Sequence, residues 1–211
     1  MKILPYIIGF ILLTNVFACQ RETIYPLAMQ KAESLMNTRP DSALQILKTI
    51  SQPEKLTGQE QADYALLLTQ ARSRNRITAT SDSLIRIATD YFQDSNDNAR
   101  KAKAFLYLGD VYMDMQNHVE AMKALKQAEE VLDDAEAGVQ SLIYSNLAYL
   151  NRESSNYELA WKYYQKALNV NISNGYTERI VTNLTNVLNL PLPKVQDSIT
   201  IYINQLDHHY L

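Results

Sequence analysis

The chain has 211 residues, 46% hydrophobic and 20% charged, a composition typical of a globular protein rather than a disordered one. Its formal net charge of −3 lacks the basic excess typical of nucleic-acid binding, so we expect no nucleic-acid partner. With only five glycines and six prolines, the chain lacks the frequent turns of an all-β protein. The composition therefore favours an all-α fold.

The N-terminal segment is typical of a secretory signal peptide covering residues 1–18. After Lys2, an apolar stretch carries no charge until Arg21, and it is shorter than the roughly 20 residues of a membrane-spanning helix. The less favoured alternative is a buried strand or helix. Val16 to Cys19 resembles a bacterial lipobox, in which Ala18 precedes the modified cysteine. Cys19 is the only cysteine, so no disulfide partner competes with this interpretation, and a chance free cysteine is the alternative.

The sequence therefore predicts lipid attachment at Cys19, with residues 19–21 as a short tether. The mature protein would be anchored in the cell envelope, in the outer membrane rather than the inner one, and would contact the membrane through its lipid.

From residue 22 to residue 211 we expect five helical hairpins in succession. The expected ranges are 22–51, 59–93, 98–134, 139–172 and 176–210. Asp and Ser side chains at 40–42, 81–83 and 196–198, and Asn156, are predicted to cap the second helices, because their oxygens accept from free backbone N–H groups.

Two series of residues support this repeat. The aromatic residues Tyr25, Tyr64, Phe105 and Tyr144 are separated by 39, 41 and 39 positions. The second-helix positions Ala43, Leu84, Ala121, Ala160 and Ile199 are separated by 41, 37, 39 and 39. The two series share one period of about 39 residues. We also expect small residues such as Gly109 and Ala121 to face each other between paired helices.

The third hairpin resembles the tetratricopeptide repeat. The residues that carry this resemblance are Phe105, Leu108, Gly109, Tyr112, Ala121, Leu125 and Ala128. The family has a period of about 34 residues, so the longer period here leaves open a helical-hairpin repeat of another type. The resemblance implies a right-handed superhelical solenoid of about five hairpins, with a concave groove lined mainly by first helices.

That geometry, carried over to the matching units, implies a groove for a partner. Its residues would be Thr69, Arg72, Lys103, Leu106, Asp110, Met113, Ser145, Tyr149 and Arg152. The alternative is that these are ordinary solvent-facing residues.

No pattern of catalytic or metal-binding residues stands out. His118 has no nearby ligand spacing, and the adjacent His208 and His209 point about 100° apart on a helix, which does not suit a metal pair. No phosphate-binding glycine loop or nucleophile motif occurs. We therefore expect a binding protein rather than an enzyme, with no cofactor and no metal.

Over residues 19–172 the chain is similar to the N-terminal part of tetratricopeptide lipoproteins and sensor proteins of Bacteroidetes-type bacteria. The phrases that carry this similarity lie at residues 32–36, 40–44, 64–71 and 80–84. It implies a membrane-anchored scaffold that binds an envelope protein or peptide, as the ligand-binding part of a sensor. The alternative is an envelope-biogenesis lipoprotein, of the outer-membrane β-barrel assembly or pilotin type.

The last expected helix, about residues 194–210, carries an apolar stripe that should pack on the first helix of the fifth hairpin. The stripe comprises Val195, Ile199, Tyr202, Leu206 and Tyr210. No polar capping helix follows in the sequence, so we expect this edge to be covered by a partner or a second copy, or the chain to be a shortened relative of longer proteins. Under both interpretations, the protein without its lipid is expected to self-associate through this helix or to bind an apolar probe.

Overall fold

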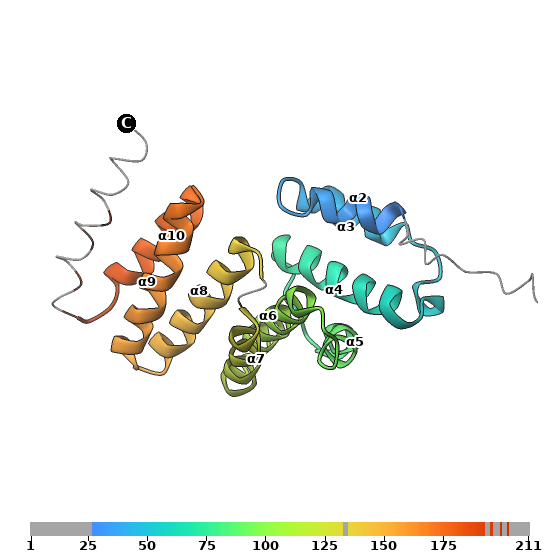
Figure 1. Cartoon of the computed structure of the whole chain (residues 1–211). Helices are drawn as coiled ribbons and strands as arrows, with labels where there is room; N and C mark the ends of the chain where they lie inside the picture. The colour runs from blue at the N-terminus through green and yellow to red at the C-terminus, as the bar shows by residue number, and fades with distance from the viewer. Residues whose placement is uncertain (1–26, 133–134, 193–194, 196–198, 200–201, 203–211) are drawn as a thin grey trace, which may run out of the picture.

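The structure is a computed structural model that describes residues 27–132, 135–192, 195, 199 and 202 (Figure 1). Those residues form α-helices and one short 3-10 helix, η2 (Pro53–Lys55), without a strand. The all-α prediction is confirmed for this part of the chain. The helices are α2 (Leu27–Leu35), α3 (Pro40–Lys48), α4 (Gly58–Arg74), α5 (Ser83–Phe92), α6 (Asn98–Asp114), α7 (His118–Glu130), α8 (Ala137–Glu153), α9 (Tyr157–Ser173) and α10 (Thr177–Leu188).

The helices pack in the order in which they occur in the chain. Each helix contacts the next, with α2–α3, α4–α5, α6–α7 and α8–α9 forming pairs across short turns (Figure 1). The alternate helices α2, α4, α6 and α8 also contact one another in sequence. This pattern leaves α2 and α10 at opposite ends of a curved arrangement, with the alternate helices on one side of it (Figure 1).

The observed helices lie within a few residues of the expected hairpins. The pairs cover residues 27–48, 58–92, 98–130 and 137–173, and α10 begins at residue 177. Gly138 was expected between helices but lies in the first turn of α8, which begins at Ala137. The predicted signal peptide and Cys19 lie outside the described residues. Within the described part, no helix is long and apolar enough to cross a membrane.

Small residues allow paired helices to approach closely. Ala43, Ala121 and Ala160, which mark the second helices, are fully buried. A Cβ atom placed on Gly109 of α6 would lie 3.5 Å from the backbone oxygen of Ala121 in α7. The expectation that these two residues face each other is confirmed.

Four helices end in the same hydrogen-bonded turn. After α4, α6, α8 and α9, a residue with positive φ is followed by a backbone N–H that donates to a carbonyl five residues earlier, as from Asn117 to Tyr112 at 2.8 Å. This is the Schellman motif, which usually takes glycine at the positive-φ position. Only Gly175 follows that rule, whereas Arg76, Gln116 and Ser155 adopt the left-handed conformation with φ between 56° and 59°.

Helix capping differs from the expectation. Arg39 precedes α3 and Asn156 precedes α9, and neither side chain caps its helix. Asp82 holds the N-cap position of α5, but its carboxylate binds Arg86 and Tyr112 instead of the helix backbone. Side-chain caps occur at other positions, where Asp97 accepts from the N–H of Arg100 and Asn117 accepts from the N–H of Glu120.

The start of the apolar C-terminal stripe is buried as expected. Val195, Ile199 and Tyr202 are 3%, 7% and 8% exposed. The Tyr202 ring packs edge-on against Trp161 of α9 with centroids 6.3 Å apart, and it also clusters with Ile180 of α10. Leu206, Tyr210 and the rest of this segment lie outside the described residues.

Candidate functional site

A polar cavity of about 790 Å³ runs along the alternate helices. Its lining side chains come from α2, α4, α6, α8 and α10, and from the turns before α8 and α10. Six charged residues line it, three acidic and three basic, namely Glu33, Arg74, Lys103, Glu136, Glu178 and Arg179. A volume of this size is within the range of about 300–1,000 Å³ found for ligand pockets.

The cavity contains two of the predicted groove residues. Lys103 lines it and forms an ion pair with Glu136, with Nζ and Oε1 3.3 Å apart. Ser145 also lines it and donates to Oδ1 of Asn183 at 3.1 Å. Both pairs connect neighbouring alternate helices, because Glu136 immediately precedes α8 and Asn183 lies on α10.

Two of the predicted groove residues belong to the helix packing instead. Leu106 is 0% exposed, and Thr69 is 6% exposed with its hydroxyl donating to the Ala65 carbonyl of its own helix. Neither side chain reaches an open surface, so both are corrected from groove to interior. In the structure Thr69 of α4 and Leu106 of α6 lie on helix faces that pack inside the protein, so the carried-over register is wrong at these two positions.

The remaining predicted groove residues lie on first helices but outside the cavity lining. Arg72 is exposed on α4, and Met113 is partly buried on α6. The Arg152 guanidinium lies 5.0 Å from the Tyr149 ring centre and donates from Nη1 to Oδ1 of Asn186 at 3.2 Å. This last contact ties α8 to α10.

Asp110 is the centre of a network that joins three alternate helices. Its carboxylate accepts from Ser73 of α4 at 3.1 Å and from Asn146 of α8 at 2.5 Å. Loss of solvation raises the pKa of Asp110 to about 7, although the two hydrogen bonds act in the opposite direction. Asp114, one turn away, adds to the rise through its negative charge.

Arg74 and Arg179 are the basic residues of the cavity that the sequence did not indicate. Arg74 lies at the end of α4 and Arg179 in the first turn of α10. Burial lowers the pKa of Arg179, and the positive charge of Arg74 lowers it further. No local pattern pairs these two arginines, because more than 100 residues separate them in the chain.

Tyr107 lies in the electrostatic field of both arginines. It is 3% exposed, Gln70 lies near its hydroxyl, and burial raises its pKa well above the usual range. The nearby Asp110 charge also raises that pKa, while Arg74 and Arg179 oppose the rise.

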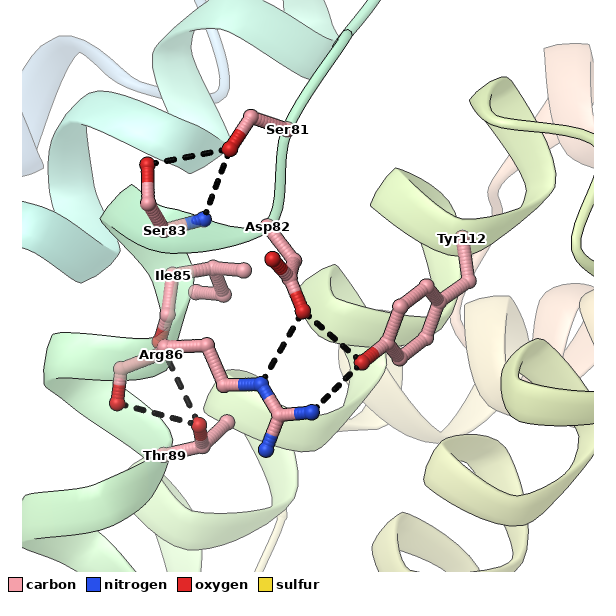
Figure 2. A network of polar contacts seen from close by, with 7 residues as sticks. All are labelled: Ser81, Asp82, Ser83, Ile85, Arg86, Thr89 and Tyr112. Carbon is pink, nitrogen blue, oxygen red and sulfur yellow. Dashed lines mark hydrogen bonds and ion pairs between the residues drawn. The ribbon is translucent and has the colours of Figure 1, made fainter.

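A second cavity, of about 570 Å³, lies among α5, α6 and α7. At its edge the Tyr112 hydroxyl accepts from Nη2 of Arg86 at 2.8 Å and donates to Oδ2 of Asp82 at 2.9 Å (Figure 2). Arg86 completes the triangle with Nε 3.0 Å from the same carboxylate oxygen. Hydrogen bonds from Arg86 and Tyr112 lower the pKa of Asp82. This network joins the turn before α5 to α6.

In the described ranges, no three His, Cys, Asp or Glu side chains are grouped as a metal site would require. His118 begins α7, and His208 and His209 lie outside those ranges. Comparison of the chain with models of protein families, with curated proteins and with solved structures finds no match.

Proposed function

We propose that the chain is a tetratricopeptide-like helical-repeat lipoprotein that binds a peptide or protein segment of the bacterial cell envelope in the cavity between its alternate helices. The observation that carries this proposal is the cavity itself. It is continuous across five helices that are distant in sequence, and it combines charged groups with apolar side chains such as Val139 and Leu142.

The fold supports a binding role because successive helix pairs bury their apolar faces on their neighbours. Stacks of this kind form extended concave surfaces that repeat proteins use for recognition. The two neighbouring-helix contacts in the cavity, Lys103 with Glu136 and Ser145 with Asn183, connect its walls without a ligand. A preformed wall lowers the ordering cost of binding.

Two threonines on α10 provide a matched test. Thr182 and Thr185 are both exposed, and each hydroxyl donates to the carbonyl four residues earlier, at 2.8 and 2.9 Å. Thr182 lines the cavity, whereas Thr185 does not. Thr182→Trp should obstruct the cavity, and Thr185→Trp should leave it open.

The experiment is cross-linking and affinity capture of the tagged full chain from solubilised envelopes, comparing wild type with the two variants. A partner captured by wild type and Thr185→Trp but lost with Thr182→Trp supports binding in the cavity. Equal capture by all three proteins would reject it.

The proposed anchor is tested separately at Cys19. Metabolic labelling with a radioactive fatty acid should label the wild-type chain and leave Cys19→Ala unlabelled. Label in Cys19→Ala at the wild-type level would reject the lipoprotein assignment without affecting the cavity.

A further inference from the structure

We propose that the cavity holds an oxyanion of its ligand, a carboxylate or phosphate group, between Arg74 and Arg179, with the Tyr107 hydroxyl as a third donor. The inference deepens the proposed function and depends on it for the nature of the larger ligand. Binding of a simple anion, however, is a property of the cavity alone.

The first argument is the approach of two like charges. Arg74 of α4 and Arg179 of α10 line the same cavity, and the charge of one acts on the other. The ion pairs formed by the described residues include neither arginine. Two guanidinium groups that line one cavity and are not neutralised by an ion pair repel, and an anion between them converts this repulsion into attraction.

The second argument is that donor capacity remains on both side chains. Arg179 donates from Nη1 to the Gly138 carbonyl at 2.6 Å, and its guanidinium lies 5.0 Å from the Tyr176 ring centre. Arg74 makes a long bond of 3.4 Å from Nη2 to the carbonyl of Asn37. A guanidinium has five N–H donors in a planar fork, so each side chain is held in position while other donors remain for an oxyanion.

The third argument is the protonation of Tyr107. Burial raises the pKa of this hydroxyl, so it keeps its proton at neutral pH. Tyr107 lines the cavity, so its protonated hydroxyl can donate to a ligand oxygen there.

An independent observation also indicates a polar ligand. Asn183 lines the same cavity, is 2% exposed, and its Nδ2 atom has no hydrogen-bond partner among the described residues. Its Oδ1 accepts from Ser145, which fixes the amide. A buried amide donor without a partner costs free energy, and a ligand oxygen would remove that cost.

The test is isothermal titration of the full chain in mild detergent with inorganic phosphate and with succinate, at constant ionic strength. Arg74→Gln is compared with Arg72→Gln, because both arginines lie in the last turn of α4 and only Arg74 lines the cavity. Saturable binding by wild type is expected, with a Kd raised about tenfold or more by Arg74→Gln and unchanged by Arg72→Gln.

Tyr107→Phe and Arg179→Gln should also raise the Kd. Tyr107→Phe keeps the ring and so serves as the second variant if the loss of the Arg179 bond to Gly138 impairs folding. Tighter binding of phosphate than of succinate identifies a phosphorylated ligand, and the reverse order identifies a carboxylate. Absence of saturable binding, or equal weakening by Arg72→Gln and Arg74→Gln, would overturn the proposal.

The result also separates the two proposals. Anion binding that depends on Arg74, together with equal partner capture by Thr182→Trp and Thr185→Trp, would keep the anion site and reject the peptide-binding function. Loss of partner capture with Thr182→Trp, together with no anion binding by wild type, would keep the peptide-binding function and reject the anion site.

Discussion

Gly109 of α6 packs directly against Leu125 of α7: a Cβ atom on Gly109 would lie 2.7 Å from Leu125 Cγ and 2.9 Å from Cδ2. Leu125 is 0% exposed, so surrounding atoms restrict its movement. The close approach of α6 and α7 therefore depends on the missing side chain at residue 109.

We expect Gly109→Ala to lower the free energy of unfolding by about 1–2 kcal/mol. The overlap with Leu125 costs about 1–3 kcal/mol, which exceeds the gain of up to about 1 kcal/mol from helix propensity. Gly138→Ala is the control, because its Cβ would meet Arg179 Nη1 at an ordinary 3.5 Å. Urea unfolding measures both variants, and a Gly109→Ala protein as stable as wild type would contradict the packing described.

Tyr112→Phe should lower the free energy of unfolding by about 1 kcal/mol, because it removes the hydroxyl that joins Asp82 to Arg86. Tyr91→Phe is the matched control, since Tyr91 is 41% exposed and its ring forms a T-shaped pair with Phe92, a contact that the substitution keeps.

The Tyr112 effect should also depend on pH. The pKa of Asp82 is lowered in the folded protein, so the stabilisation by its charged form is present above the unfolded pKa of about 3.8 and is lost as pH falls. Unfolding at several pH values should show the difference between Tyr112→Phe and wild type shrinking below about pH 4. A difference that grows on acidification would contradict this role for the Asp82 charge.

Asp110 should show the opposite pH dependence. Its folded pKa of about 7 lies above the unfolded value of 3.8, so folding favours the protonated form. Its contribution to stability is therefore fully present below about pH 4 and declines until the pH has passed 7. Asp110→Asn removes this titration while keeping an amide oxygen that can accept from Asn146.

We accordingly expect Asp110→Asn to gain stability relative to wild type as pH rises from 4 to 8, by at least about 1 kcal/mol. Thermal unfolding at fixed ionic strength across this range measures the effect. Parallel pH profiles for the two proteins would show that Asp110 titrates normally.

The Schellman turns after α8 and α9 predict opposite stability changes for two substitutions. Ser155→Gly should raise the free energy of unfolding by up to about 1 kcal/mol, because Ser155 has a φ of 59°, a conformation that is unfavourable for a residue with a Cβ atom. Gly175→Ala, at the equivalent position after α9, should lower it by about the same amount, since Gly175 has a φ of 68°. Stability changes of the same sign in the two variants would contradict the equivalence of these turns.

The sequence by itself determined the all-α fold and the approximate bounds of its helix pairs. Apolar periodicity is a local property, and the recurrence of small residues such as Ala121 and Ala160 reports where paired helices meet. Helix caps could not be predicted from residue type alone, because a side chain that could cap a helix can also bind a residue from another part of the chain. Asp82 is a residue type that commonly caps helices, yet its carboxylate binds Arg86 and Tyr112. The ion pair with Arg86 attracts the carboxylate more strongly than backbone N–H groups do.

Only the tertiary structure decided which side chains share the cavity. Successive residues of a helix are rotated by about 100°, and this separates buried Leu106 from its neighbour Tyr107, which lines the cavity. Whether Arg74 and Arg179 line the same cavity depends on the summed rotation of every helix pair between α4 and α10. That sum is fixed by the packing of the intervening side chains, and no pattern within a single helix records it.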